Sequence, residues 1–128
     1  MKRICTVLAL AGVMLLSIGS QCRERYEHAP CVEITDPLDG EELERGPMNL
    51  VASVEDEDGD EITYVGFDVV GRAHAVATYY GNDYYCASVN TTDFPAGRYQ
   101  LICESYCSET DPTKRSTVGV DTVYFNLR

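Results

Sequence analysis

Basic residues and histidines are scarce in this sequence. Its 128 residues include 10 Lys plus Arg, 21 Asp plus Glu and 2 His, which gives a formal net charge of -11 at pH 7. Binding to phosphate backbones or anionic lipid surfaces requires clustered Lys and Arg. The composition therefore excludes nucleic acid as a partner, and it leaves the membrane as a partner only through a covalent anchor.

Catalytic motifs are also absent. The sequence has no G-x-S-x-G, no H-E-x-x-H and no phosphate-binding loop, which are the patterns that place nucleophiles, zinc ligands or phosphate contacts. Two histidines are too few for most acid-base sets, and we expect His74 on a strand surface. The sequence therefore predicts no enzyme and no organic cofactor.

The N-terminus has the pattern of an export signal. Lys2 and Arg3 precede an apolar run from Ile4 to Ile18, and the small residues Gly19 and Ser20 follow it. A charged start, a short apolar stretch and small residues are typical of a cleaved secretory leader, and the run is short for a membrane span. We therefore expect a leader over residues 1–21, a linker over 22–30 and an exported domain over 31–128, anchored at a bacterial envelope or secreted.

The position of cleavage decides whether the protein is anchored. Cys22 follows Ser20 and Gln21 and could accept a diacylglyceryl group like the cysteine of a bacterial lipoprotein, although Gly19 and Gln21 depart from the usual cleavage box. An ordinary cut after Gly19 is the alternative. Lipidation would explain why the exported chain has an odd number of cysteines.

Four further cysteines predict two disulfides. Cys31, Cys86, Cys103 and Cys107 form an even set in an exported chain, a pattern typical of oxidising compartments. Zinc is disfavoured because no C-x-x-C pair is present. An extended 103–107 segment separates its ends by about 13 Å, beyond the reach of roughly 7 Å that a disulfide tolerates. Two pairings remain open, Cys31–Cys107 with Cys86–Cys103, or Cys31–Cys103 with Cys86–Cys107.

Hydrophobic residues alternate with a period of two beyond residue 31. This spacing is typical of strands that bury one face, and Asp-, Gly-, Asn- and Pro-rich turns separate the segments. Val118 and Val120 have the opposite parity to Val123, so we expect a bulge or the end of a loop near Asp121 and Thr122. The pattern predicts an all-β, two-sheet antiparallel sandwich of about seven strands. Its alternating segments are Met48–Val54, Val65–Val69, Tyr85–Val89, Tyr99–Cys103 and Val123–Leu127.

The order of these segments resembles bacterial immunoglobulin-like domains. The matching stretches are VEITDPLDGEEL at 32–43, MNLVASVEDEDGDEITYVGFDVVG at 48–71 and VNTTDFPAGRYQLICES at 89–105. The resemblance implies that Tyr99 is a corner tyrosine whose hydroxyl bonds to backbone upstream, and it favours Cys31–Cys107. Trp is absent and the segment of the second strand lacks Cys, so the usual inter-sheet disulfide of the family is not expected.

An acidic turn is a candidate calcium site. Glu55 to Glu61 hold six carboxylates in seven residues, and Asp56, Asp58 and Asp60 have the spacing that begins a calcium loop. Gly59 stands before Asp60 and Phe67 occupies the position where an EF-hand needs Glu, which excludes an EF-hand. A looser site helped by Glu41, Glu42 or Glu44 is the remaining calcium hypothesis, and a solvated turn is the alternative.

Four tyrosines flank a second turn. Tyr79 and Tyr80 precede Gly81-Asn82-Asp83, and Tyr84 and Tyr85 follow it. Alternation buries one tyrosine of each pair at most, so at least two should be exposed near a sheet edge. Exposed tyrosines are typical of binding surfaces, and cross-strand packing is the alternative. We therefore predict a contact with an unknown protein or glycan here.

These observations lead to a prediction of function. We expect a noncatalytic, extracytoplasmic interaction or adhesion module of a bacterial envelope or secreted protein, a class that comes from the family resemblance. The alternative is a structural or calcium-stabilised envelope lipoprotein without a soluble partner.

Overall fold

The computed structural model describes residues 30–56, 61–108 and 118–128. The predicted leader, Cys22 and the rest of the linker up to residue 29 lie outside these ranges. Residues 57–60 of the acidic turn also lie outside them. None of the described residues belongs to a helix long and apolar enough to cross a membrane.

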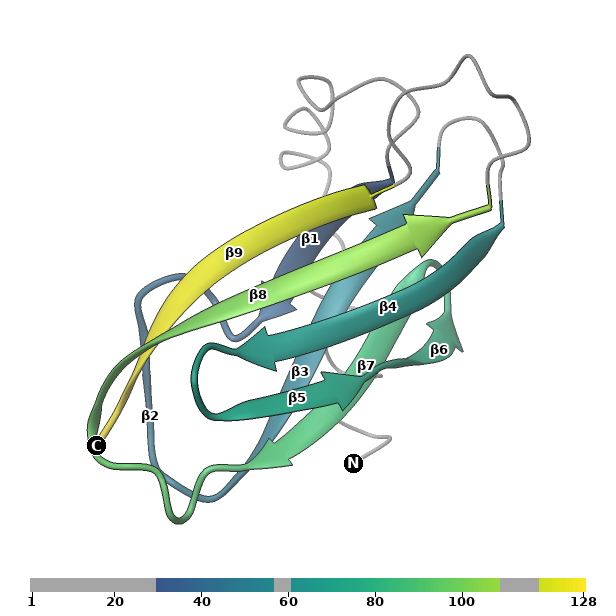
Figure 1. Cartoon of the computed structure of the whole chain (residues 1–128). Coiled ribbons are helices and arrows are strands. Elements are labelled where there is room, and N and C mark those ends of the chain that lie inside the picture. The colour runs from purple at the N-terminus through teal and green to yellow at the C-terminus, as the bar shows by residue number, and fades with distance from the viewer. Residues whose placement is uncertain (1–29, 57–60, 109–117) are drawn as a thin grey trace.

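The described chain forms nine strands in two sheets that pack face to face (Figure 1). One sheet has the order β1-β3-β7-β6 and the other has the order β2-β9-β8-β4-β5. Neighbouring strands are antiparallel except β2 and β9, which are parallel. The strands are β1 (Cys31–Asp36), β2 (Glu41–Leu43), β3 (Pro47–Glu55), β4 (Ile62–Val69), β5 (Ala73–Val76), β6 (Thr78–Gly81), β7 (Tyr84–Asn90), β8 (Gly97–Cys107) and β9 (Val118–Leu127).

The predicted all-β sandwich is therefore confirmed. The strands exceed the expected number of about seven because β2, β5 and β6 are short edge strands of three or four residues. Such segments are too brief to show a clear alternation. The predicted turn at Gly81-Asn82-Asp83 joins β6 to β7, and Asn82 and Asp83 have the positive φ angles, 54° and 67°, that a two-residue hairpin turn requires.

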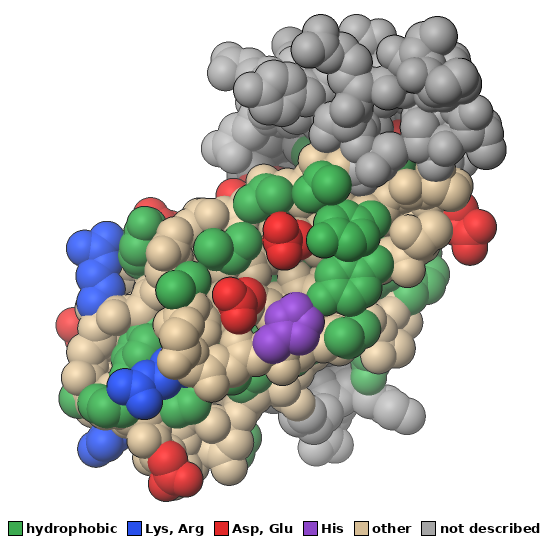
Figure 2. All heavy atoms as spheres, viewed as in Figure 1, with side chains coloured by type: hydrophobic (Ala, Val, Ile, Leu, Met, Phe, Trp, Pro, Cys, Tyr) green, Lys and Arg blue, Asp and Glu red, His purple; other side chains and the backbone are tan. Residues whose placement is uncertain are grey.

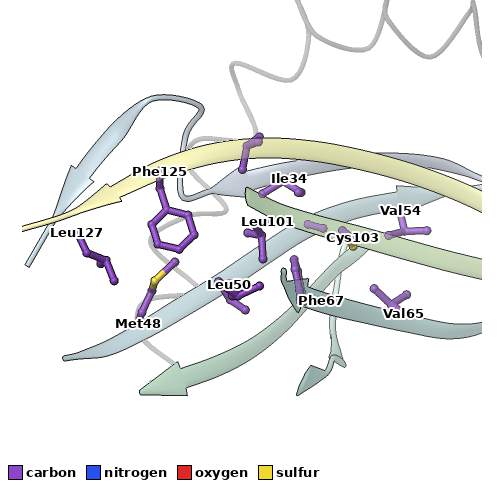
Figure 3. Packing of buried hydrophobic residues seen from close by; sticks show 13 residues of the cluster. Ile34, Met48, Leu50, Val54, Val65, Phe67, Leu101, Cys103, Phe125 and Leu127 are labelled. Carbon is purple, nitrogen blue, oxygen red and sulfur yellow. The ribbon is translucent and has the colours of Figure 1, made fainter. Parts of the chain in front are cut away.

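The core lies between the two sheets (Figure 3). Every second side chain of the long strands points into it, and burying one large apolar side chain contributes about 1.5–3 kcal/mol. The predicted inward positions Tyr85, Ala87 and Val89 pack against the core while only partly buried. Its buried members are Ile34, Met48, Leu50, Ala52, Val54, Val65, Phe67, Val69, Leu101, Cys103, Val123, Phe125 and Leu127.

The expectation of a bulge or loop end near Asp121 and Thr122 is wrong, because β9 continues through both residues. The register of β8 and β9 runs without a shift from Gly97↔Leu127 to Tyr106↔Val118, so Val118 and Val120 point outward and Gly119 and Asp121 take the inward positions. A glycine and a carboxylate at inward positions concealed the alternation in the sequence. Asp121 Oδ2 accepts a hydrogen bond of 2.8 Å from the backbone N–H of Ile34, which joins β9 to β1 of the opposite sheet.

Tyr99 closes the connection between β7 and β8. Its hydroxyl donates a hydrogen bond to the carbonyl oxygen of Pro95 at 2.5 Å, and its ring packs between those of Phe94 and Phe125, each 5.7 Å away between centroids. The corner role that the family resemblance implied for Tyr99 is confirmed.

We expect Tyr99→Phe to lower the free energy of unfolding by about 1 kcal/mol, the net contribution of one such hydrogen bond. The ring packing remains, so the loss isolates the hydroxyl. Urea denaturation followed by circular dichroism measures the change. Tyr124→Phe is the control because its exposed ring should leave stability within about 0.5 kcal/mol, and equal losses in both variants would contradict the corner role.

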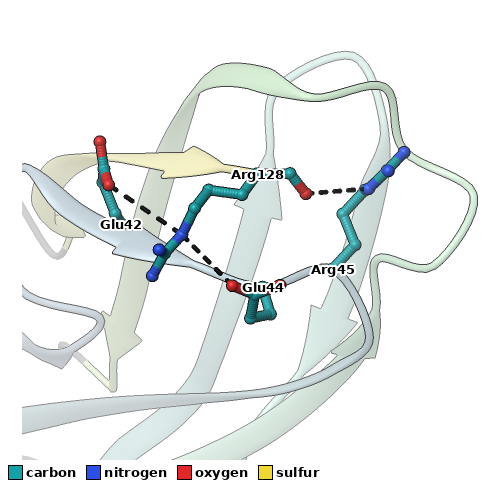
Figure 4. Close-up of polar contacts among 4 residues, drawn as sticks. All are labelled: Glu42, Glu44, Arg45 and Arg128. Carbon is teal, nitrogen blue, oxygen red and sulfur yellow. Dashed lines mark hydrogen bonds and ion pairs between the residues drawn. The ribbon is translucent and has the colours of Figure 1, made fainter.

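Arginine side chains tie β2 to the end of β9 (Figure 4). Arg128 Nε lies 3.4 Å from a carboxylate oxygen of Glu44 and 4.0 Å from one of Glu42. Arg45 Nε donates to the backbone carbonyl of Arg128 at 3.1 Å. These groups are exposed, so each ion pair stabilises by less than about 1 kcal/mol, and the cluster mainly fixes the position of β2.

Candidate binding surfaces

An exposed apolar surface covers the outside of the five-stranded sheet. We call it the aromatic face, and it consists of Tyr64, His74, Tyr106, Val118 and Val120. The register brings them together from four strands, because Tyr106 lies opposite Tyr64 on β4 and opposite Val118 on β9. Tyr106, Val118 and Val120 are 41%, 40% and 54% exposed. Figure 2 shows hydrophobic side chains gathered on this side beside a histidine.

The aromatic rings of this face contact one another. The hydroxyl of Tyr64 lies 2.8 Å from Nε2 of His74, and the two rings are nearly parallel with centroids 6.5 Å apart. The Tyr106 ring lies 5.2 Å from that of Tyr64 on the other side. Desolvation is the largest cause that raises the pKa of Tyr64, and the neighbouring Tyr106 and Glu104 raise it further. The phenol therefore keeps its proton at neutral pH.

Gly66 determines where the Tyr64 ring lies. A Cβ atom at position 66 would stand 2.0 Å from the Tyr64 hydroxyl oxygen and 2.5 Å from Cζ. Heavy atoms cannot approach so closely, so any side chain at this position would push the ring away. The glycine therefore lets Tyr64 lie flat along β4 and reach His74.

Carboxylates border the aromatic face. Asp68 pairs with His74 across β4 and β5, and Glu104 lies between Gly66 and Val120 in the register. The arginines in the described part of the chain lie around the other end of the sandwich, where Arg72 and Arg98 stand over the rings of Phe94 and Tyr124. Among the residues that the structure describes, the charges nearest the aromatic face are therefore negative.

The four tyrosines of the β6–β7 hairpin differ in exposure. Tyr79 and Tyr80 are 56% and 42% exposed, whereas Tyr84 is buried. Tyr85 points toward the core and its ring lies 5.1 Å from that of Tyr79. The expectation of two exposed rings is confirmed. The prediction that Tyr84 contacts a partner is wrong, because its side chain packs with Val51 and Cys86 in a buried cluster outside the main core. The binding role of Tyr79, Tyr80 and Tyr85 stays a prediction.

A hollow of 320 Å³ lies beside Tyr80. It opens where the chain leaves β5 and enters β6, crossing from one sheet to the other. The sequence showed the tyrosine but not the hollow, because its walls come from β3, β5, β6 and β7. Its lining residues are Asn49, Ala75, Val76, Thr78, Tyr80, Cys86, Ala87 and Ser88.

The predicted disulfide pairings are both wrong. Cys103 and Cys107 carry buried thiols, whereas Cys31 and Cys86 are disulfide-bonded to neither of them. Cys103 points into the main core while Cys86 belongs to the cluster outside it, so a sheet separates their sulfurs. The exclusion of a Cys103–Cys107 bond is confirmed, because β8 is extended through both residues.

Of the three aspartates in the calcium hypothesis, only Asp56 lies in the described part of the chain. Asp58 and Asp60 lie outside the described residues, and Asp56 directly follows the end of β3. The expected help from Glu41, Glu42 and Glu44 is wrong because these residues precede β3 and lie at its opposite end. Glu41 accepts a hydrogen bond from the backbone of Leu38. In the described ranges, no group of three His, Cys, Asp or Glu residues is placed to hold a metal.

Comparisons with known proteins bear on the fold. The endo-beta-1,4-mannanase of Thermotoga petrophila matches 77% of this chain with a TM-score of 0.64 and 16% identity. The endo-beta-1,4-mannanase of Cellulomonas fimi also matches 77% of this chain, with a TM-score of 0.58 and 16% identity. The chain spans only 20% and 18% of those proteins. Fibronectin(III)-like modules of Clostridium thermocellum CbhA match 75% of the chain over 93% of their own length, with a TM-score of 0.54 and 20% identity.

No protein-family model matches the chain, and no curated protein matches it significantly. Identities this low relate the structures by fold alone. The chain is therefore an all-β sandwich whose fold is similar to that of fibronectin(III)-like modules.

Proposed function

We propose that this protein is a noncatalytic, exported interaction module that binds a protein partner through its aromatic face. The observation that carries the proposal is the contiguous exposure of Tyr106, Val118 and Val120 on one sheet, beside the half-buried ring of Tyr64. Monomeric proteins rarely leave contiguous apolar side chains in water unless the patch has a function, and tyrosine is enriched in protein interfaces.

The charges suggest the chemistry of the partner. Asp68 and Glu104 border the face, and the whole chain has a formal charge of -11. A partner with Lys or Arg next to apolar side chains would pair with these carboxylates, and its cations could stack on the tyrosine rings. We propose a basic protein surface of this kind.

Photocrosslinking tests the aromatic face. We expect a photoreactive phenylalanine derivative at position 106 to capture a protein from the native envelope, and the same group at Leu38, an exposed residue far from this face, to capture none. Tyr64→Ala should weaken capture about 30-fold, the effect of losing an interface hot spot. Added salt should weaken it further because the partner is basic.

Gly66→Ala is the matched variant that keeps every exposed side chain. It should displace the Tyr64 ring and reduce capture about 10-fold, whereas Val70→Ala, an exposed change on the same hairpin, should not. Similar melting temperatures would show that each variant is folded. Capture that is equal from positions 106 and 38, or unaffected by both Tyr64→Ala and Gly66→Ala, would contradict the proposal.

We also propose export with a lipid anchor on Cys22. The leader pattern of residues 1–21 and the disulfide-bonded state of Cys31 and Cys86 support an oxidising compartment. Palmitate labelling of the full chain that is lost in Cys22→Ser would support the anchor, and release of an unlabelled wild-type protein into the medium would contradict it.

A further inference from the structure

The hollow beside Tyr80 has walls of neutral chemistry. Asp, Glu, Lys, Arg and His are all absent from its lining. Tyr80 offers an exposed ring at the side, and Asn49, Thr78 and Ser88 supply an amide and two hydroxyl groups. The small apolar side chains of Ala75, Val76 and Ala87 and the disulfide-bonded Cys86 complete the lining.

The polar groups of the hollow are available to a ligand. Among the described residues, no hydrogen bond joins the side chain of Asn49, Thr78, Tyr80 or Ser88 to another residue. Asn49 lies opposite Ser88 in the register of β3 and β7, and Thr78 lies opposite Cys86 on the next strand. The three groups therefore stand on adjacent strands of one sheet and face the same side.

The backbone keeps this arrangement in place. The N–H of Ala77 donates to the carbonyl oxygen of Val65 at 2.9 Å, which holds the crossing segment against the five-stranded sheet. On the other side, Thr78 pairs with β7. The hollow thus lies between two fixed strands, and a ligand would find it formed in advance.

We propose that this hollow binds a neutral carbohydrate, with the face of one sugar ring on Tyr80 and its hydroxyls on Asn49, Thr78 and Ser88. The C–H groups on a sugar face suit the negative face of an aromatic ring. Sugar hydroxyls both donate and accept hydrogen bonds, as do the amide and hydroxyls of the hollow. An ionic ligand would find no counter-charge here, and a purely apolar one would leave these polar groups unsatisfied.

The volume agrees with a ligand of this size. Small-molecule sites occupy about 300–1,000 Å³, so 320 Å³ lies at the small end and suits a short saccharide. The site is separate from the aromatic face, and the proposal stands independently of the protein partner proposed above.

Titration of the full chain with cellobiose, maltose, lactose and mannobiose tests this inference. We expect at least one of the four to shift the NMR signals of the Asn49 side-chain amide and the backbone amides of Ala75 and Ser88. The Kd should be about 1 mM, a value typical of a weak, shallow site. Glucuronic acid is the charged comparison and should bind at least tenfold more weakly.

Two tyrosine variants provide the contrast. Tyr80→Ala should weaken binding at least tenfold, whereas Tyr79→Ala, an exposed neighbour outside the hollow, should leave it within about twofold. Tyr106→Ala should have no effect, which separates this site from the aromatic face. The proposal is overturned if none of the four disaccharides shifts these signals at about ten times the expected Kd, if Tyr79→Ala and Tyr80→Ala weaken binding equally, or if glucuronic acid binds as well as the neutral sugars.

Discussion

Replacing Gly119 with alanine is expected to lower the free energy of unfolding by about 3 kcal/mol, at the upper end of typical overpacking costs. A Cβ atom at this position would stand 2.2 Å from the carbonyl oxygen of Pro30 and 2.9 Å from Cγ2 of Val32. The first of these atoms belongs to the backbone, so β1 must shift away from β9 to make room. The added methyl would thus open the junction between the two sheets.

Urea denaturation of Gly119→Ala measures this loss, with Val120→Ala as the control on the next residue. Val120 is 54% exposed, so its truncation should change stability by less than about 0.5 kcal/mol. A loss below about 1 kcal/mol in Gly119→Ala would contradict the close packing of β1 against β9.

The domain should be more stable at pH 5 than at pH 8, by about 2 kcal/mol. Burial, reinforced by Asp121, raises the pKa of Glu33 from 4.5 to about 7, and burial with Glu41 raises that of Asp36 from 3.8 to about 6. Burial also raises the pKa of Asp121 against the opposing effect of its backbone hydrogen bonds. Because these groups are half-buried, screening by water reduces the full effect of the shifts.

The sign follows from proton linkage. Between about pH 4 and pH 7 the folded state holds more protons than the unfolded state, so stability falls as the pH rises through this window. Urea denaturation at pH 5 and pH 8 measures the difference. Glu33→Gln should be more stable than the wild type at pH 8 and should lose about half of the pH dependence, whereas stability that increases from pH 5 to pH 8 would contradict the raised pKa values.

The core could be predicted from the sequence because its strands are long. Met48, Leu50, Ala52 and Val54 occupy four successive inward positions of β3, and all are buried. An alternation of this length is specific to one face of a strand. Tyr99 was recognisable for a different reason, since a local turn places its hydroxyl four residues from its acceptor, Pro95.

The candidate surfaces depend on contacts that the sequence does not show. Tyr64, Tyr106 and Val120 lie on three different strands, and only the register makes them neighbours. In the sequence alone, a valine that points outward cannot be told from one in the core. The parity of Val118 and Val120 therefore led to the expectation of a bulge or loop end, whereas in the structure both residues are exposed.

Cysteine pairing was unpredictable for a related reason. Cys86 lies in the same strand as the inward residues Tyr85 and Ala87, but its side chain points to the other side. Parity within β7 could have placed it there. The deciding fact is that Cys103 points to the opposite side of that sheet, and this follows only from the packing of the two sheets.

The edges of the sheets have a consequence for behaviour at high concentration. β5 and β6 each end a sheet with only four residues, β2 covers β9 with three, and β1 is irregular between Ile34 and Asp36. Main-chain groups on such short borders offer few donors and acceptors to another molecule. Crowded copies should therefore resist joining into continuous fibrils, and their encounters should stay reversible on dilution.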